Sequence, residues 1–195
     1  MLVIPDHIKG LIFDLDGTLV DTMPLHLKSW VAVGEFFNVP ITEELINQHL
    51  GTPTIALVNR FNNDFGWGLD PKSVRKKKSE FYDKFKGEVG KIKPIEEIYT
   101  IALDQKGKMP MCIATGSSRG NAIRSLEDIG AADWWVKVVT GSDDIPGKPN
   151  PEIFQVCAEA MSLRPEECMV FEDGPSGIEA ATNAGMLVVD VTKRK

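Results

Sequence analysis

Five short apolar runs, separated by stretches with helical periodicity, constrain the fold of this chain more than any other feature of the sequence. The runs cover residues 10–13, 111–114, 136–139, 168–171 and 186–189. Strands that are apolar on both faces are typical of a parallel sheet covered by helices on both sides. Their alternation with helices predicts the α/β class, as an open, doubly wound, mainly parallel five-stranded sheet. With 195 residues the chain is long enough to bury the core of such a sheet.

One long segment after the first strand interrupts this alternation. It contains no convincing strand, and its apolar spacing predicts a helix around Trp30, a second over residues 45–60 and a third that begins at Asp70. About 70 residues is far more than an ordinary connection between a strand and a helix. The division we expect is residues 1–19 and 89–195 for the α/β core and residues 20–88 for an inserted helical cap subdomain.

Charge and apolar patterning exclude several classes of function. The chain has 22 Lys and Arg against 28 Asp and Glu, a net charge of −6, so it lacks the basic footprint for nucleic acid or an anionic membrane surface. No apolar stretch approaches the ~20 residues that span a bilayer, and no signal-peptide pattern precedes the first strand. We therefore expect a cytoplasmic protein in which Cys112, Cys157 and Cys168 are buried thiols.

Acidic residues follow two of the expected strands. Asp14 and Asp16 come directly after the first strand, and side chains two positions apart in an extended segment point to the same side. Glu172 and Asp173 follow the fourth strand. Carboxylates that lie this close together repel, and oxygens from two strand ends suit a hard cation, most commonly Mg²⁺. The structural alternatives are turn chemistry at Asp16-Gly17 and an acidic helix N-terminus at Glu172-Asp173.

Hydroxyl groups and a lysine follow two other strands. Thr115, Gly116 and Ser117 open the helix after the second strand, where hydroxyls and backbone amides suit a phosphate group. Lys148 follows the third strand and can neutralise a phosphate or pair with an acidic nucleophile. Taken singly, these are a routine helix N-cap and a surface lysine. Together the four strand ends suit phosphoryl transfer through an aspartyl-phosphate, in which one Asp attacks and the other transfers protons.

In order and spacing, four motifs of the chain resemble those of the haloacid dehalogenase-like superfamily. They are Asp14-Leu15-Asp16-Gly17-Thr18, Thr115, Lys148-Pro149 and Glu172-Asp173-Gly174. The resemblance covers essentially the whole chain and implies a Rossmann-like core with a helical cap inserted after the first motif. It implies that Asp14 is the nucleophile, that Asp16 is the general acid and base, and that Thr115 and Lys148 steady the phosphoryl group. The implied Mg²⁺ ligands are Asp14, the backbone carbonyl of Asp16, and Asp173, with Glu172 close by. Gly17, Thr18, Gly116 and Ser117 are the implied substrate contacts of the core.

The cap segment is similar to that of the β-phosphoglucomutase and sugar-phosphatase branch of the superfamily. The substrate contacts implied there are His26, Trp30, Gly51, Thr52 and Lys78. The mutases usually have an arginine shortly after the cap glycine, and Thr54 stands in its place, which favours a phosphatase.

The expected function is therefore a Mg²⁺-dependent, monomeric phosphatase of small sugar phosphates. The nearest alternative is a hexose-phosphate mutase with the same aspartyl-phosphate chemistry. A more remote alternative is a non-catalytic module that is switched by phosphorylation of Asp14. A switch needs neither a general acid nor a substrate lid, so the complete set of motifs argues against it.

Overall fold

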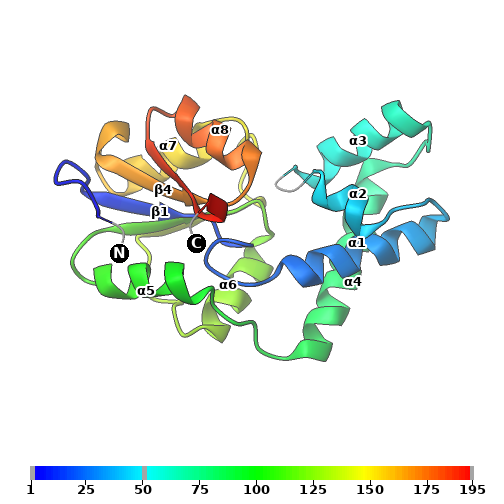
Figure 1. Cartoon of the computed structure of the whole chain (residues 1–195), viewed down its shortest axis with the longest axis horizontal. Helices are drawn as coiled ribbons and strands as arrows, with labels where there is room; N and C mark the ends of the chain where they lie inside the picture. The colour runs from blue at the N-terminus through cyan, green and yellow to red at the C-terminus, as the bar shows by residue number, and fades with distance from the viewer. Residues whose placement is uncertain (1–2, 50–51, 194–195) are drawn as a thin grey trace. The chain divides into compact units, whose positions relative to one another are not determined.

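The computed structural model describes residues 3–49 and 52–193, and the chain forms two compact units. The first unit comprises Met1–Asp21 and Lys93–Lys195 and contains the β-sheet, and the second comprises Thr22–Ile92 and is helical (Figure 1). Each unit has its own group of buried apolar side chains.

The sheet has five parallel strands in the order β3-β2-β1-β4-β5. The strands are β1 (Gly10–Phe13), β2 (Met111–Ala114), β3 (Lys137–Val139), β4 (Cys168–Glu172) and β5 (Leu187–Asp190). Every residue of β1, β2 and β4 is buried, as expected for strands that are apolar on both faces. The predicted fold class is confirmed, and β1 lies at the centre of the sheet.

Helices cover both faces of this sheet. Figure 1 shows α5 (Glu96–Gln105) and α6 (Arg119–Asp128) on one side, and α7 (Glu152–Ala160) and α8 (Pro175–Asn183) on the other. Phe154 of α7, with no exposed surface, belongs to the buried group between α7, α8 and the sheet. That group includes all three cysteines, whose predicted burial is confirmed. Short 3₁₀ segments at Pro165–Glu167 and Val191–Lys193 flank β4 and β5.

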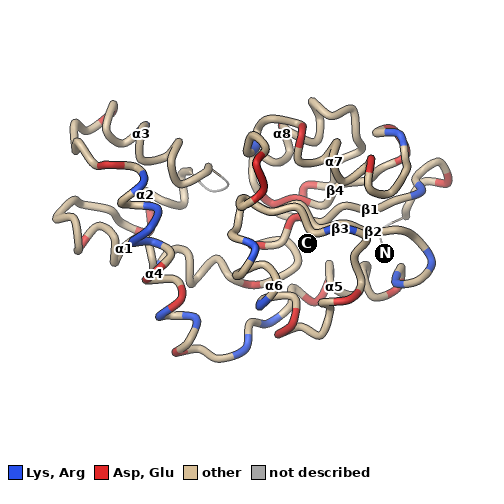
Figure 2. The backbone as a smooth tube through the Cα atoms, turned by 180° about the vertical axis from the view of Figure 1, so that it is seen from behind, with Lys and Arg blue, Asp and Glu red and all other residues tan. Residues whose placement is uncertain are grey.

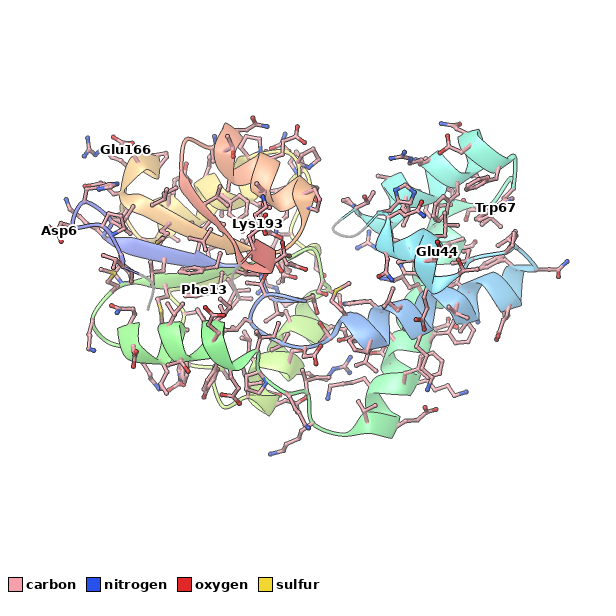
Figure 3. The ribbon with its side chains drawn as sticks, in the orientation of Figure 1. Asp6, Phe13, Glu44, Trp67, Glu166 and Lys193 are labelled. Carbon is pink, nitrogen blue, oxygen red and sulfur yellow. The ribbon has the colours of Figure 1, made fainter. Side chains whose placement is uncertain are left out.

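Aromatic stacking across neighbouring strands adds to the packing of the sheet. The Phe13 ring at the end of β1, which Figure 3 labels, stacks on Phe171 of β4 with ring centroids 4.7 Å apart. Trp135 contacts the same Phe13 ring edge-on at 5.7 Å. Because Phe13 directly precedes Asp14, this packing fixes the backbone from which the first acidic residue extends.

The helical unit consists of α1 (Met23–Phe37), α2 (Glu43–Asn47), α3 (Thr54–Phe65) and α4 (Pro71–Val89). Its core includes Trp30 of α1 and Phe61 of α3, and the Phe61 ring contacts Trp67, which is labelled in Figure 3. The prediction of one helix over residues 45–60 is wrong, since α2 ends at Asn47 and α3 begins at Thr54. Pro53 precedes α3 in an extended conformation, and a proline inside a helix removes a hydrogen bond and clashes with the preceding turn.

The predicted start of the third helix is confirmed. Asp70 is the N-cap of α4, and its side chain accepts a hydrogen bond of 2.8 Å from the backbone N–H of Ser73. Figure 2 shows basic residues (blue) along α4, and the sequence of this helix includes Lys78. The helical unit has ten Lys and Arg against eight Asp and Glu, whereas the sheet-containing unit has twelve against twenty. The two units therefore differ in the sign of their net charge.

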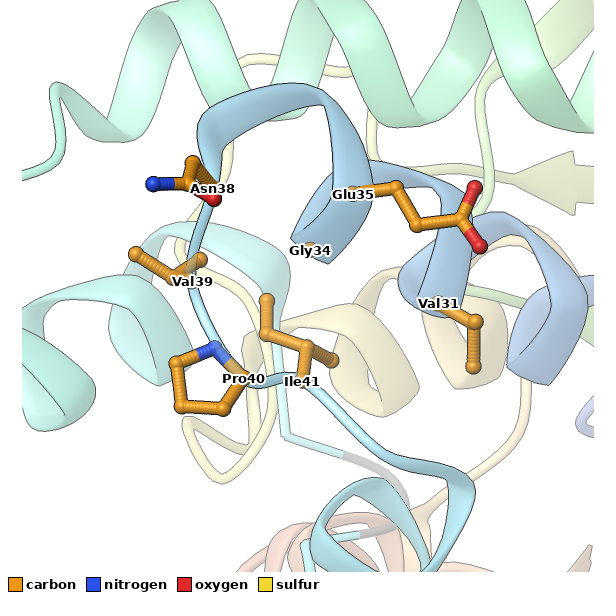
Figure 4. Close-up of a pocket in the computed structure, with 7 residues that line it drawn as sticks. All are labelled: Val31, Gly34, Glu35, Asn38, Val39, Pro40 and Ile41. Atoms are coloured by element: carbon orange, nitrogen blue, oxygen red, sulfur yellow. The ribbon is translucent and has the colours of Figure 1, made fainter.

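A surface depression in the helical unit lies beside the C-terminus of α1 (Figure 4). Its lining residues are Val31, Gly34, Glu35, Asn38, Val39, Pro40 and Ile41. Glu35 is the charged residue among these seven. Its negative charge would repel a phosphate group, and the seven lining residues include no cation to bind one. The chemistry predicted from the sequence belongs to the other unit.

None of the helices in residues 3–49 and 52–193 combines the length and the apolar character that a membrane span requires.

Candidate active site

The candidate active site lies where the parallel strands end. Asp14 directly follows β1, Thr115 follows β2, Glu172 is the last residue of β4, and Asp173 comes next. Lys148 belongs to the segment after β3. The strand order reverses between β1 and β4, and in open α/β sheets ligands bind at the carboxyl ends of the strands at such a reversal.

Lys148 joins two buried carboxylates at this edge. Its Nζ donates hydrogen bonds to Asp14 Oδ1 at 2.6 Å and to Glu172 Oε2 at 2.7 Å, and a third to the carbonyl oxygen of Ala114 at 3.0 Å. The side chains of Lys148, Asp14 and Glu172 are 9%, 9% and 4% exposed. Three short contacts, one of them to Asp14, therefore fix the ammonium group in a nearly dry environment.

Burial and an excess of negative charge together govern the protonation of Asp14 and Lys148. Burial and the charge of Glu172 raise the pKa of Asp14 well above its ordinary value, although Lys148 acts in the opposite direction. Burial disfavours the charged form of Lys148, but the charges of Asp14 and Glu172 outweigh it and raise the lysine pKa. The ammonium is thus always present at neutral pH, yet it does not neutralise all the carboxylates around it.

Asp173 adds a third carboxylate. Burial and the charge of Glu172 raise the pKa of Asp173 to about 6, while a hydrogen bond of 3.0 Å from Thr18 Oγ1 to Asp173 Oδ1 lowers it. Thr18, predicted as a substrate contact, has no exposed surface and lies against Asp173. In this structure its hydroxyl orients an acidic side chain.

These residues fit a divalent cation. Asp14, Glu172 and Asp173 each offer a carboxylate oxygen, and the three oxygens lie within 4.8 Å of one another. Three carboxylates face one ammonium, and oxygen ligands in excess of the local positive charge are what a hard cation such as Mg²⁺ requires.

Asp16 lies in a second group, with the hydroxyls that follow β2. Ser117 Oγ donates to Asp16 Oδ2 at 2.6 Å, and Thr115 Oγ1 donates to the same oxygen at 3.2 Å. The backbone N–H of Ser117 donates to Thr115 Oγ1 at 3.0 Å. The structure therefore brings the second aspartate and both predicted hydroxyls together. Gly116, between them, is exposed, and Gly17 continues the turn after Asp16.

A set of residues that the sequence analysis did not single out supports this loop. Arg119, the first residue of α6, forms an ion pair with Asp143, in which its Nη2 donates to Oδ1 at 2.7 Å and to Oδ2 at 2.9 Å. Asp143 Oδ2 also accepts the backbone N–H of Thr140 at 2.7 Å. A Cβ atom added to Gly141 would lie 3.0 Å from the carbonyl carbon of Gly116, so the segments after β2 and β3 touch directly. The run Thr140-Gly141-Ser142-Asp143 is typical of a turn, but Arg119, the ion-pair partner of Asp143, is 24 residues away in the chain.

Three of the residues predicted from the cap lie together within the helical unit. Lys78 Nζ lies 3.4 Å from His26 Nδ1 and 5.3 Å from the centroid of the Trp30 ring. The His26 ring stacks on Tyr82 with centroids 4.7 Å apart. Thr52 is half-buried just before α3. Gly51 lies outside the described residues.

The chain is similar to known proteins over most of its length. A family model described as "Hydrolase: haloacid dehalogenase-like hydrolase" matches residues 8–185. The chain is 32% identical over 186 residues to the fructose-1-phosphate phosphatase YqaB of Escherichia coli (strain K12), a match that covers 95% of this chain and 97% of that protein. It is 28% identical over 189 residues to the β-phosphoglucomutase of Bacillus subtilis (strain 168), with 94% of this chain and 83% of that protein covered.

Solved structures show the same architecture. The crystal structure of β-phosphoglucomutase from Clostridium difficile matches with a TM-score of 0.79 at 24% identity, and the match covers 94% of this chain and 91% of that chain. At this identity the likeness concerns the fold alone.

Proposed function

The chain belongs to the haloacid dehalogenase-like hydrolase family, and from this membership we propose that it hydrolyses small sugar phosphates, with bound Mg²⁺, through an aspartyl-phosphate on Asp14. As a family member with a relative named as a phosphatase, it is a phosphoric monoester hydrolase. The sugar substrate, the metal and the covalent intermediate are the parts that we propose.

One observation carries the proposal: Asp14 is the most central acidic residue of the site, buried and held by Lys148 Nζ at 2.6 Å. A carboxylate held in one position by a buried ammonium is oriented for attack on phosphorus, and that ammonium offsets part of the charge of the incoming phosphate. Asp14, Glu172 and Asp173 would hold Mg²⁺, which when bound would withdraw charge from the phosphoryl oxygens.

The reaction has two steps on the side chains of this protein. A carboxylate oxygen of Asp14 forms a bond to phosphorus while the bond from phosphorus to the sugar oxygen breaks, and Asp16 gives its proton to that leaving oxygen. Asp16, now ionised, takes a proton from a water molecule, whose oxygen attacks phosphorus and releases phosphate from Asp14. Ser117 and Thr115 orient Asp16 in both steps through their hydrogen bonds to its Oδ2.

The helical unit Thr22–Ile92 is, in this proposal, the cap that recognises the sugar. Lys78, His26 and Trp30 combine a cation, an imidazole and an aromatic face, which together suit a polar, hydroxyl-bearing ring. Exclusion of water by such a lid protects a phosphoenzyme from premature hydrolysis.

The test is phosphate release from a panel of sugar phosphates, in Mg²⁺ and in EDTA, by the wild type and by Asp14→Asn. We expect metal-dependent release by the wild type and none by Asp14→Asn. Asp104→Asn makes the same chemical change at an exposed position of α5 and should leave release unchanged. Substantial release by Asp14→Asn would reject the assignment of the nucleophile.

The second candidate is a hexose-phosphate mutase, which the similarity to the β-phosphoglucomutase of B. subtilis favours. A mutase would return the phosphoryl group from Asp14 to the sugar instead of to water. An assay with a hexose monophosphate and a catalytic amount of hexose bisphosphate distinguishes the two, because isomerised sugar phosphate rather than free phosphate would accumulate.

A further inference from the structure

The carboxylate of Glu172 lies across the first turn of α8 and is fixed at both oxygens. Oε1 accepts the backbone N–H of Gly174 at 3.0 Å, and Oε2 accepts Lys148 Nζ at 2.7 Å. The Glu172 side chain is almost completely buried, so water does not readily replace either contact. The place of this carboxylate therefore helps to fix the place of the Lys148 ammonium, together with Asp14 and the carbonyl oxygen of Ala114.

The space that the carboxylate occupies exists because Gly177, the third residue of α8, has no side chain. A Cβ atom at Gly177 would overlap the carboxylate group of Glu172 and would lie 2.6 Å from its Cγ. Gly177 has ordinary helical backbone, with its N–H donating to Gly174 O at 3.0 Å, so no left-handed conformation explains the glycine. Glycine is among the poorest helix formers, and this position would otherwise favour alanine.

We propose that Gly177 is a positioning residue of the active site: its missing side chain sets the place of the Glu172 carboxylate, and through it the place of Lys148 Nζ and of the cation site formed with Asp14 and Asp173. The inference rests on the proposed function insofar as it concerns a cation. Gly177 has no side-chain atom to offer a substrate or a metal, and in this proposal it acts through Glu172.

The first test needs no turnover and no metal. In EDTA, Gly177→Ala should lower the thermal unfolding midpoint, although alanine is the better helix former, because the buried carboxylate must leave Lys148. Gly120→Ala is the matched control: Gly120 is the second residue of α6, and an added Cβ there meets no atom within 4 Å. Gly120→Ala should keep or raise the midpoint. A midpoint for Gly177→Ala at or above the wild-type value would overturn the proposal.

The second test uses Mn²⁺ alone as the probe, titrated calorimetrically into metal-free protein without substrate. Gly177→Ala should bind Mn²⁺ at least about tenfold more weakly than the wild type, the usual effect of displacing a group that orients metal ligands. Gly120→Ala should bind as the wild type does. Equal affinities of Gly177→Ala and wild type would overturn the proposal, whatever the wild type hydrolyses. A wild type that binds no Mn²⁺ would instead contradict the proposed function, and the unfolding test would still decide the role of Gly177.

The third test separates this overlap from a general disturbance of α8. Glu172→Asp shortens the side chain by one methylene and withdraws the carboxylate from position 177. If Gly177 acts through Glu172, the double variant Gly177→Ala, Glu172→Asp should be at least as stable as Gly177→Ala alone. Losses that simply add would overturn the proposal. Should Gly177→Ala fail to fold, recovery of folding in the double variant would support the proposal and an unfolded double variant would contradict it.

Discussion

Asp16 is the residue whose proposed role can be separated most sharply from that of its neighbours. Its Oδ2 accepts hydrogen bonds from Ser117 and Thr115, and its proposed tasks are to protonate the leaving sugar oxygen and then to activate water. A p-nitrophenolate leaving group departs as a stable anion and needs no proton. The two tasks of Asp16 can therefore be examined one at a time.

For Asp16→Asn we expect turnover of a sugar phosphate to fall by about 10²–10⁴-fold, the usual contribution of a general acid or base. With p-nitrophenyl phosphate the variant should release close to one equivalent of p-nitrophenol in a rapid burst, because Asp14 still attacks, and then stall at hydrolysis of the phosphoenzyme. Stopped-flow absorbance measures the burst. Absence of the burst would assign Asp16 to the first step for every leaving group and contradict a purely proton-transferring role.

Lys148 supplies a second prediction at this scale. Lys148→Ala would leave Asp14 and Glu172 buried without their ammonium, and removal of one partner from a buried ion pair costs about 3–5 kcal/mol. Urea denaturation in EDTA should show this loss in the free energy of unfolding. Because a cation can replace part of the missing positive charge, Mg²⁺ should restore more stability to the variant than it adds to the wild type.

Lys108→Ala, a change at an exposed lysine in the turn before β2, is the control for Lys148→Ala. Exposed charges contribute about 0–1 kcal/mol, so its free energy of unfolding should stay near the wild-type value. An equally small loss for Lys148→Ala would mean that the three contacts of its Nζ do not stabilise the folded chain.

The acidic groups of the site could be predicted from the sequence because each directly follows an apolar strand, and parallel strands end at one edge. What each side chain contacts could not. Thr18 contacts Asp173 and Ser117 contacts Asp16, although both were expected to contact substrate. A hydroxyl can donate in any direction around its Cβ, so its partner depends on tertiary distances. The pair Arg119 and Asp143 could not be predicted for the same reason, since nothing local to either residue indicates the other.

At the scale of elements, Glu167 ties the start of β4 to the start of β1. Its Oε1 accepts Lys9 Nζ at 2.6 Å, and its Oε2 accepts the backbone N–H and the Nε of Arg164 at 3.1 and 3.2 Å. These hydrogen bonds lower the pKa of Glu167 from 4.5 to about 2. The side chain of Arg164 has the largest effect and that of Lys9 the next largest. A carboxyl whose pKa is lowered by folding stabilises the protein above its unfolded pKa, and this contribution is lost as the pH falls through the folded value.

Glu167→Gln should therefore be less stable than the wild type at neutral pH, and the difference should shrink as the pH falls from about 4.5 to about 2. Denaturant unfolding at a series of pH values measures it. Glu166→Gln removes the neighbouring carboxyl, which is 61% exposed on the side chain, and should show a smaller difference throughout. A difference for Glu167→Gln that does not change with pH would indicate lost packing rather than lost charge.

Element boundaries were predictable where the sequence contains a local stop or start signal. Asp70 before Pro71 marks the N-terminus of α4, and the structure has it there. The apolar spacing of residues 45–60 predicts a single helix because it continues across Pro53. Periodicity alone does not show where the backbone leaves the helical conformation. The proline is itself the signal that separates α2 from α3.

At the scale of the whole molecule, the sheet could be predicted more fully than its surroundings. Strands buried on both faces leave few alternatives to a parallel sheet with helices on both sides, and that is the observed architecture. The internal packing of Thr22–Ile92 was not predictable, because amphipathic helices can pack in several ways and the choice depends on how bulky side chains such as Trp30 and Phe61 fit together.

Because each unit has its own buried core, we expect a core substitution in one unit to destabilise that unit and not the other. Phe61 in the helical unit and Phe154 in the sheet-containing unit both have no exposed surface, and each belongs to the buried group of its own unit. Truncation of a buried phenylalanine costs about 3–5 kcal/mol. Amide hydrogen exchange followed by mass spectrometry should show faster exchange within Thr22–Ile92 for Phe61→Ala, with β1 and β4 still protected. Phe154→Ala should show the reverse pattern.

The same pair of variants tests the division of labour that we propose. If the helical unit recognises the sugar while the chemistry belongs to the strand ends, Phe61→Ala should raise KM for the sugar phosphate and keep the p-nitrophenol burst. Phe154→Ala should diminish the burst itself, because α7 packs against the sheet that positions Asp14. Faster exchange in both units for either variant would show that the chain unfolds as one cooperative body, and a defect in the helical unit would then reach the burst as well.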